Sequence, residues 1–486
     1  MVRAIGSSAL GVLVSLCFLL CSCGGGTGDT DRIQISSVPI QTGGFIRESL
    51  TIGPNHERFC YAVEIDERHR MIVDGVPGEI YDAALRAHFS PGGRRLVYYA
   101  GEGDEQFVVI DGVESPHYDA IQYRSAVFSE DGEQFGYVAR RGEEQFVVLN
   151  GEEQTPYDAI FPNSLRFNAD GSQYAYIARD GDDWFLVWNG EEYREHDVMG
   201  GLARPARKQR SPVDEIQLMQ NPTVNLLFNP SGDRLAYSAF RDYAQVVLIS
   251  DAEGRFHEVI EKNYDDVTSL TFSPDGRRIG FRARIGSDWF AIVDGVEWGP
   301  YAGIWDQTPQ FSPDGGHALI IAAQGDQWFV VVDQEEGPRF ENVGNPVFSP
   351  DGEHLAYTVY TSQPAERWFI MIDGVERTEF AGVAMPTFSP DGERFAYRAQ
   401  VADKQLVILD GTRQKPYLDV KEIAFSPDSR HVAYMARDYN GWYVVTDQEE
   451  AEPLGYVFSM GFQPDGRLRY AAARGENMLF VTREIR

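Results

Sequence analysis

The chain has 486 residues and carries 43 Lys and Arg against 74 Asp and Glu, which gives a formal net charge of −31. A surface this acidic repels phosphate backbones, so nucleic acid is excluded as an expected partner. The same charge favours solubility strongly and cationic partners weakly. The length is sufficient to bury a large apolar core.

The chain begins with an export signal. Arg3 is the one charge before an apolar run over residues 9–20, which is too short to span a bilayer comfortably. The run ends in the sequence LCSCG at residues 20–24, which resembles the bacterial lipobox. On this resemblance residues 1–22 are a lipoprotein signal peptide and Cys23 is acylated, which anchors the protein at the cell envelope. An ordinary secretory signal with incidental cysteines is the alternative.

Residues 23–32 are expected to form a flexible tether, since the glycine-rich stretch has few side chains to bury. The residue after Cys23 is Gly and not Asp, which by resemblance to enterobacterial lipoprotein sorting implies the outer membrane and leaves the periplasmic or surface face open. Beyond the tether only Cys60 remains, so the exported domain has no internal disulfide. We expect Cys60 to be a small buried strand residue and not a nucleophile.

One five-residue motif recurs through residues 33–486. Phe-Ser-Pro-Asp-Gly begins at Phe272, Phe311, Phe348 and Phe388, looser copies begin at Phe89, Phe128, Phe167, Phe228, Phe425 and Phe462, and a degenerate copy begins at Ile52. The period of about 40 residues, built only of short strands and turns, is typical of β-propeller blades. These eleven repeats predict an all-β propeller of four-stranded antiparallel blades.

The repeat that begins at Phe272 shows how one blade is built. Phe272 ends the first strand, and Ser-Pro-Asp-Gly turns the chain into a second strand at residues 278–283. A third strand at residues 289–293 leads through Asp294-Gly295, a two-residue hairpin signal, into a fourth strand at residues 296–301. Third strands are apolar almost without a break, so we expect each sheet to be covered on both faces by neighbouring blades.

Two segments depart from the regular repeat. The last repeat ends after its third strand, whereas residues 33–38 form a spare strand at the start. We predict that this strand completes the last blade and closes the ring, which removes open sheet edges. Residues 196–224 form an insertion that contains a basic cluster at residues 204–210. A solvated loop is the simplest interpretation of this insertion, and a docking loop for an acidic partner or lipid head groups is the alternative.

The Phe-Ser-Pro-Asp-Gly pattern, with its Asp-Gly hairpins, resembles the PD40 or WD40-like repeat of TolB-type β-propellers over residues 49–486. That family includes periplasmic protein-binding propellers and the propeller domains of prolyl-oligopeptidase-type enzymes. Two departures limit what the resemblance implies. The repeats begin directly after the tether, without a preceding α/β domain. The chain also contains no Gly-x-Ser-x-Gly nucleophile elbow and has no room for a hydrolase domain.

Known propellers of such families usually have about four to eight blades. Eleven repeats therefore favour two propellers, divided near the insertion or near residue 270. A single very large ring is the alternative.

Two polar positions recur and are candidates for a ligand-binding face. One is an arginine after the second strand, with an acidic residue or glycine close behind it: Arg140, Arg179, Arg284, Arg437 and Arg474. We expect ion pairs across the hairpin, as between Arg140 and Glu144 or Arg284 and Asp288. The other is an aspartate before the first strand, Asp82, Asp119 and Asp158. These carboxylates either cap local turns or form a ring that binds a cation or a basic peptide.

The histidines are scattered and no zinc-binding spacing occurs, so we expect no catalytic residue, metal or cofactor. The leading hypothesis is a lipid-anchored propeller that binds a protein or peptide in the envelope without being an enzyme, with membrane contact through the anchor alone. The alternative is a polysaccharide-active hydrolase or lyase that uses carboxylates of the propeller channel. A structural spacer is a third possibility.

Overall fold

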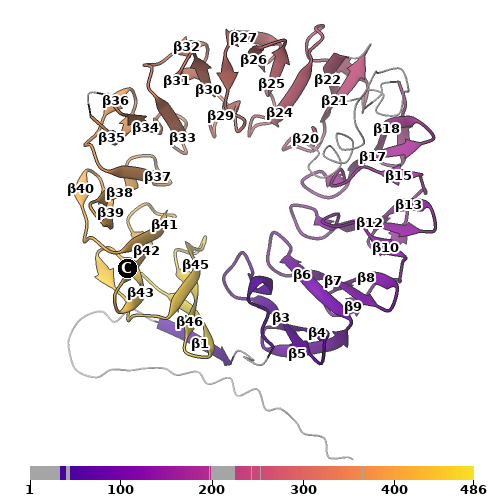
Figure 1. Ribbon diagram of the computed structural model, residues 1–486, viewed down its shortest axis with the longest axis horizontal. Coiled ribbons are helices and arrows are strands. Elements are labelled where there is room, and N and C mark those ends of the chain that lie inside the picture. Colours follow the sequence, from indigo (N-terminus) through magenta and orange to yellow (C-terminus); the bar gives the residue numbers. More distant parts are fainter. Residues whose placement is uncertain are drawn as a thin grey trace, which may run out of the picture.

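The computed structural model describes residues 33–39, 44–195, 198, 225–241, 244–251, 253–363 and 365–485. The predicted signal peptide, Cys23, the tether and the basic cluster at residues 204–210 lie outside these residues. The described residues form eleven antiparallel sheets arranged as blades of one ring (Figure 1). They contain no α-helix and one short 3-10 helix, η1 (Arg47–Ser49). No helix in this described part is long and apolar enough to cross a membrane.

Each blade has four strand positions, which follow one another from the inner side of the ring outward. The first five blades comprise β2 (Thr51–Ile52), β3 (Phe59–Ile65), β4 (Arg68–Val73) and β5 (Val76–Tyr81); β6 (Ala83–Phe89), β7 (Leu96–Glu102), β8 (Glu105–Ile110) and β9 (Val113–Glu114); β10 (Ala120–Ile121) with β11 (Val127–Phe128), β12 (Phe135–Arg141), β13 (Glu144–Leu149) and β14 (Glu152–Glu153); β15 (Ala159–Ile160) with β16 (Arg166–Phe167), β17 (Tyr174–Asp180), β18 (Asp183–Trp188) and β19 (Glu191–Tyr193); and β20 (Leu226–Phe228), β21 (Leu235–Arg241), β22 (Ala244–Ser250) and β23 (Phe256–Glu258).

The remaining six blades follow the same order. They comprise β24 (Asp266–Phe272), β25 (Ile279–Ile285), β26 (Asp288–Val293) and β27 (Val296–Tyr301); β28 (Gly303–Ile304) with β29 (Gln310–Phe311), β30 (Ala318–Gln324), β31 (Gln327–Val332) and β32 (Glu335–Glu336); β33 (Asn342–Phe348), β34 (Leu355–Thr361), β35 (Arg367–Ile372) and β36 (Val375–Glu376); β37 (Gly382–Phe388), β38 (Phe395–Val401), β39 (Lys404–Leu409) and β40 (Thr412–Arg413); β41 (Asp419–Phe425), β42 (Val432–Asp438), β43 (Gly441–Thr446) and β44 (Glu449–Glu450); and β45 (Tyr456–Phe462), β46 (Leu468–Arg474), β47 (Asn477–Arg483) and β1 (Ile33–Pro39).

The four-stranded blades are confirmed, but the division into two propellers is not found, and the single large ring is the arrangement present. The physical reason is that apolar packing continues across both expected division points. One cluster joins Trp184 of the fourth blade to Tyr237 of the fifth, on the two sides of the insertion. Another joins Val247 of the fifth blade to Phe281 of the sixth, across residue 270.

The turn chemistry follows the sequence prediction. Gly276 of the Ser-Pro-Asp-Gly turn has a φ of 70°, and its N–H donates to the Ser273 carbonyl at 2.8 Å. Asp294 and Gly295 both have positive φ, 52° and 79°, as a type I′ hairpin requires. Ser273 is fully buried, and its hydroxyl donates to Asp275 Oδ1 at 2.5 Å and accepts the Arg278 N–H at 2.9 Å. The motif therefore serves as a self-contained turn that starts the second strand.

The core lies between blades and not within any one of them. Third strands are buried on both faces: in β31, Phe329, Val330 and Val331 are 0, 4 and 0 % exposed. Phe329 packs with Ala291 of the preceding blade, whereas Val330 packs with Val359 of the following blade. Full burial of such a side chain stabilises the fold by about 1.5–3 kcal/mol. Each blade therefore depends on both of its neighbours.

The predicted closure by the first strand is confirmed. β1 pairs antiparallel with β47 over its whole length, from Ile33 opposite Arg483 to Pro39 opposite Asn477. β1 supplies the outermost strand of the eleventh blade, while β2 begins the first blade next to it. Val38 packs against a cluster that includes Phe59 of the first blade and Met478 of the last. The first and last strands of the described residues therefore meet in one sheet.

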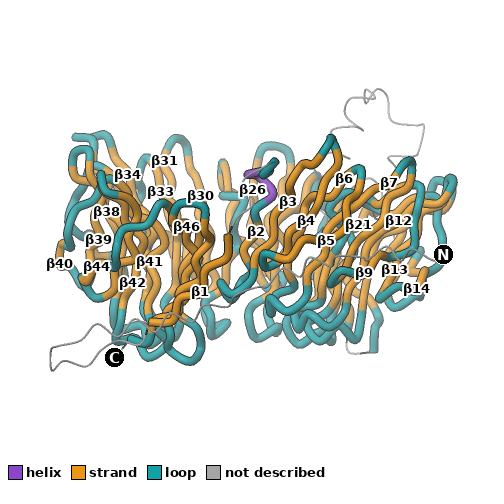
Figure 2. The backbone as a smooth tube through the Cα atoms, turned by 90° about the horizontal axis from the view of Figure 1, so that it is seen from below, coloured by secondary structure: helices purple, strands orange, loops and turns teal. Residues whose placement is uncertain are grey.

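Seen edge-on, the strands run between two loop-bearing faces of the ring (Figure 2). One face carries the Ser-Pro-Asp-Gly and Asp-Gly turns. The other carries the hairpins between second and third strands together with the connections from each fourth strand to the next blade. The innermost strands, such as β24, β33, β37 and β41, surround the centre (Figure 1). This arrangement gives three places for a site: the two faces and the inner side.

Candidate functional site

The three aspartates expected on a ligand face each bond to the hairpin of the blade that follows. Asp82 Oδ2 accepts the Gly103 N–H at 2.8 Å, Asp119 Oδ2 accepts the Gly142 N–H at 2.6 Å, and Asp158 Oδ2 accepts the Gly181 N–H at 2.8 Å. In addition, Asp82 forms an ion pair with Arg68 at 3.0 Å. These contacts are those of the turn-capping alternative. The carboxylates are therefore used by the local backbone and do not converge on one point.

Within the described residues the recurrent arginines do not form the ion pairs expected across their hairpins, and Arg474 pairs instead with Glu452 at 3.2 Å. Arg140 and Arg284 donate to the carbonyls of Gly142 and Gly286, at 2.9 and 2.8 Å, and neither has an acidic partner within the described residues. The reason is the cross-strand register, which places an amide or aromatic side chain opposite each arginine instead of a carboxylate. The guanidiniums of three of them lie 5.7 Å from the ring of a paired tryptophan: Arg179 over Trp184, Arg284 over Trp289 and Arg437 over Trp442.

The glutamines and tryptophans that begin the third strands join successive blades. Gln106 Oε1 accepts the Ile121 N–H of the next blade at 3.0 Å, and Gln145 and Gln405 make the same bond to Ile160 and Val420 at 2.9 Å. Trp184 and Trp442 are 7 and 6 % exposed. These residues are therefore packing and bridging groups.

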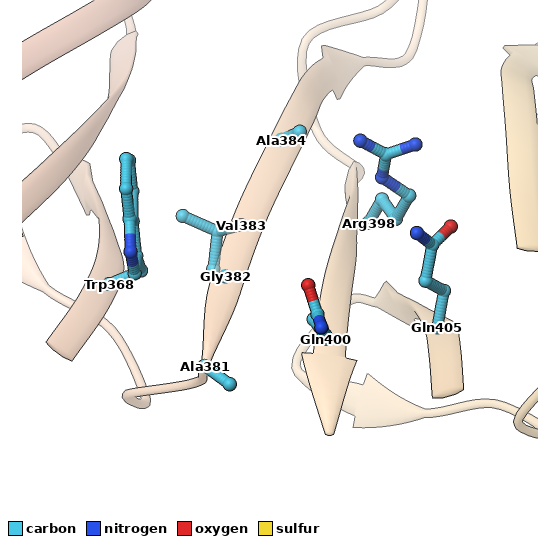
Figure 3. A pocket seen from close by; sticks show the side chains of 8 residues that line it. All are labelled: Trp368, Ala381, Gly382, Val383, Ala384, Arg398, Gln400 and Gln405. Carbon is cyan, nitrogen blue, oxygen red and sulfur yellow. The ribbon is translucent and has the colours of Figure 1, made fainter. Parts of the chain in front are cut away.

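A hollow of about 290 Å³ lies beside one of these tryptophans (Figure 3). Trp368 of β35 faces Val383 of β37, while Arg398 and Gln400 extend from β38 (Figure 3). The polar groups here already have backbone partners: Arg398 donates to the Val420 carbonyl at 3.1 Å and Gln400 to the Ala402 carbonyl at 3.2 Å. This hollow therefore offers few free polar groups to a ligand.

The inner strands contain a distortion that no sequence pattern predicted. Seven blades place a non-glycine residue in the left-handed region a few positions before the motif phenylalanine: Arg86, Arg124, Asn163, Ser269, Asn345, Met385 and Glu422, with φ between 45° and 61°. The strand register shifts at this point in β6, β24, β33, β37 and β41. A β-bulge of this kind re-aims a side chain. In this protein it recurs along the inner side of the ring.

In the second and third blades these bulges bring together two arginines and a tyrosine, which we call the inner-rim cluster: Arg86, Tyr123 and Arg124. The guanidinium carbon of Arg86 lies 3.7 Å from the centroid of the Tyr123 ring, and that of Arg124 lies 5.0 Å from it. Tyr123 is 50 % exposed, and both arginines are exposed. Within the described residues neither arginine forms an ion pair.

The inner-rim cluster borders a hollow of about 350 Å³ that is also lined by His88 and Tyr99. Burial lowers the pKa of His88, so this imidazole is neutral near pH 7. The Tyr99 hydroxyl accepts the Ala126 N–H at 3.0 Å, and burial raises its pKa. The charge of the hollow is therefore positive and comes from the two arginines. Such a surface attracts carboxylates, and its exposed ring offers a flat apolar contact.

Sequence reasoning missed this cluster because Arg86, Tyr123 and Arg124 belong to no recurring motif. The signal available in the sequence was a departure from the repeat. In two consecutive repeats of this acidic protein, an arginine stands a few residues before the motif phenylalanine. Among the described residues no group of three or more His, Cys, Asp or Glu could hold a metal ion. Cys60 is fully buried in β3, as expected, and burial raises its pKa to about 12.

No family model matches the chain, and no curated protein matches it. Among solved structures it is similar to a eukaryotic initiation factor, with 12% identity over 71% of this chain and 90% of that chain and a TM-score of 0.39. It is also similar to the β-propeller domain of the Trilobed protease from Pyrococcus furiosus, with 16% identity over 54% and 93% and a TM-score of 0.28. TolB from Acinetobacter baumannii matches with 16% identity over 65% and 78% and a TM-score of 0.24. At these values the similarities bring no function to this chain, and the propeller fold rests on the strands themselves.

Proposed function

We propose that this chain is a lipid-anchored scaffold of the bacterial cell envelope whose propeller binds a protein or peptide without acting as an enzyme. The inner-rim cluster is the observation that carries the proposal. Two exposed guanidiniums beside one half-exposed tyrosine, without an ion-pair partner in the described part of the chain, contribute little to the stability of the fold, because they repel each other. They are a good way to hold an acidic partner segment.

The charge of the whole protein strengthens this argument. The chain has an excess of carboxylates, and many of its arginines pair with one, as Arg58 pairs with Asp74 at 2.8 Å and Arg95 pairs with Asp111 at 3.1 Å. Arg86 and Arg124 are left without such a partner within the described residues. The surrounding negative charge repels acidic partners elsewhere on the ring, so it directs an acidic segment to this positive place.

The partner site can be tested with a photo-crosslinking amino acid, p-benzoylphenylalanine, in place of Tyr123 in the envelope-located protein. We expect a defined crosslinked adduct with an envelope protein. Arg86→Glu together with Arg124→Glu should reduce its yield about tenfold or more, because the two guanidiniums then become repulsive.

Two matched controls accompany this experiment. The same crosslinker at Tyr439, which is 85 % exposed on another blade, should give no such adduct. Arg255→Glu, at a side chain 75 % exposed, makes the same charge change elsewhere and should leave the yield unchanged. An absent adduct, an adduct indifferent to the arginine variants, or turnover of envelope polysaccharides by the purified protein would contradict the proposal.

The anchor has a separate support, the LCSCG sequence at residues 20–24. We expect Cys23→Ala to move the protein from the membrane fraction to the soluble fraction, because two or three acyl chains hold a protein firmly and their loss leaves no anchor. Cys21→Ala is the control and should leave the protein in the membrane fraction. Unchanged membrane retention of the Cys23 variant would rule out lipidation at this residue.

A further inference from the structure

A second site follows from a contact that recurs between blades. A tyrosine at or just after the end of the outermost strand of one blade donates its hydroxyl to a glutamate on the outermost strand of the next blade. The bond is present at four junctions: Tyr81 to Glu114 at 2.8 Å, Tyr157 to Glu192 at 3.0 Å, Tyr264 to Glu297 at 2.8 Å and Tyr417 to Glu450 at 2.5 Å. Each bond lies at the outer part of the junction and joins two blades.

The glutamate occupies one register position, opposite an apolar residue of the third strand. From the second to the tenth blade this position holds Glu114, Glu153, Glu192, Glu258, Glu297, Glu336, Glu376, Arg413 and Glu450. Arg413 in β40 of the ninth blade is the exception. One position in nine reverses its charge.

The partner of Arg413 has changed as well. Phe380 takes the place of the tyrosine, as its bridge to Trp368 matches the bridges of Tyr118 to Gln106 and Tyr417 to Gln405. The Arg413 guanidinium carbon lies 5.2 Å from the centroid of the Phe380 ring. A hydroxyl donor and its carboxylate acceptor are thus both absent, and a cation over an aromatic face replaces them.

This junction also has a hollow of about 470 Å³. Phe380, Tyr397 and Ile408 form its apolar floor and are 8, 4 and 2 % exposed. Arg377 and Arg413 lie at its edge and are exposed. Burial raises the pKa of Tyr397, while Arg377 and Arg413 both act to lower it, so both charges lie near the Tyr397 hydroxyl.

The carboxylates around the hollow do not neutralise both arginines. Asp410 is already engaged, since its Oδ1 accepts the Phe395 N–H and its Oδ2 pairs with Arg394, both at 3.0 Å. Glu393 lines the hollow without an ion pair in the described part of the chain. Two free guanidiniums against one free carboxylate leave a net positive edge around an apolar floor.

We propose that this hollow is a docking site for an acidic peptide segment of a partner protein, with an apolar side chain on the Phe380–Tyr397 floor and carboxylates against Arg377 and Arg413. Charge complementarity and the apolar floor together identify this occupant. The site lies in the eighth and ninth blades, away from the inner-rim cluster in the second and third. It therefore stands independently of the function proposed for that cluster.

The probe is an array of short fluorescent peptides, each with one Phe or Leu flanked by Asp and Glu, with copies in which Lys replaces the acidic residues. Binding to the purified chain from residue 24 onward is measured by anisotropy. We expect the acidic set to bind and the lysine set not to bind. We also expect that binding weakens with added salt, because the guanidinium–carboxylate contacts are partly exposed.

The decisive variant is Phe380→Tyr with Arg413→Glu, which installs the pair found at four other junctions and is therefore expected to fold at least as stably as the parent. It should weaken binding of the acidic set about tenfold or more, since one attractive charge becomes repulsive. Arg277→Glu makes the same charge change at a side chain 85 % exposed and should leave binding unchanged. Equal binding of acidic and lysine peptides, full binding by the double variant, or equal loss in the Arg277 control would overturn the proposal.

Discussion

At the scale of the residue, contacts between neighbouring blades explain why the Phe-Ser-Pro-Asp-Gly motif recurs. Arg278, just before β25, pairs with Asp294 of its own blade at 2.8 Å and donates to the Gly316 carbonyl of the next blade at 2.9 Å. Its guanidinium lies 5.2 Å from the centroid of Phe311, the phenylalanine of the next motif. The motif phenylalanine is therefore one half of a contact between blades, which is why it recurs with the turn.

The same position holds an arginine in several blades and other residues elsewhere around the ring. Arg58, Arg95, Arg278 and Arg394 stack on the next phenylalanine at 5.2 to 5.5 Å. In three other blades a histidine replaces the arginine and bonds to the hairpin aspartate: His317 to Asp333, His354 to Asp373 and His431 to Asp447. The scattered histidines of the sequence thus include three structural substitutes for arginine, and the imidazoles need no catalytic explanation.

At the scale of the element, β1 carries the closure of the whole ring. Its seven residues pair with β47, and Ile33 and Ile35 remain 46 and 41 % exposed on its outer side. The strand is therefore held mainly by backbone hydrogen bonds and by Val38, which packs against Phe59 and Met478. Without β1, β47 would become an open edge next to an apolar surface, a combination that favours aggregation.

Deletion of residues 33–39 is expected to destabilise the ring and to produce oligomers, because hydrogen bonds worth roughly 1 kcal/mol each are lost and an edge is exposed. Thermal unfolding and light scattering after size-exclusion chromatography measure the two effects. A synthetic peptide of residues 31–40 should restore the monomer, since it can add the missing strand in trans. The same peptide with Ile35→Pro is the control and should not. A deletion variant that stays monomeric with unchanged thermal stability would show that β1 is dispensable.

At the scale of the whole molecule, the sequence was sufficient to predict the structural features that depend on patterns repeated within each blade. The Asp294-Gly295 hairpin, the doubly buried third strands and the pairing of residues 33–38 with the last blade all follow from patterns within one repeat or from the one repeat that lacks a strand. The number of rings could not be predicted in the same way. It depends on the small rotation between blades, which is set by inter-blade packing such as that of Val247 on Phe281.

The sites were less predictable than the fold for a related reason. The recurrent polar residues that stood out, such as Asp119 and Arg284, recur because every blade needs them for its own turns. Arg86, Arg124 and Arg413 are exceptions to the repeat, and an exception is recognisable only when the register of the other blades is known. The left-handed bulge that exposes Arg86 adds a backbone conformation that arginine seldom adopts.

The turn aspartates make the stability of the ring depend on pH at acidic values. The effect is large enough to measure because the same turn recurs in several blades. Hydrogen bonds, the largest from the motif serine and the others from backbone N–H groups, lower the pKa of six of them: Asp131, Asp275, Asp314, Asp351, Asp391 and Asp428. A carboxyl with a lowered pKa in the folded state stabilises that state above its unfolded pKa, near about 4. This stabilisation is lost as the pH falls through the folded pKa.

We therefore expect the melting temperature to be nearly constant between about pH 5 and 7 and to fall steeply below about pH 4. The double variant Ser312→Ala, Ser349→Ala separates the contribution of the turn aspartates from that of the other carboxylates. It removes two buried hydroxyls that donate to Asp314 and Asp351. It should melt several degrees lower than the parent at neutral pH, and the difference should shrink as the pH falls and these aspartates are protonated in both proteins. Exposed Ser287→Ala, outside the motif turns, is the matched control and should follow the parent. A deficit that stays the same from pH 6 to the acid limit would mean that the serines act through packing and not through the charge of the aspartates.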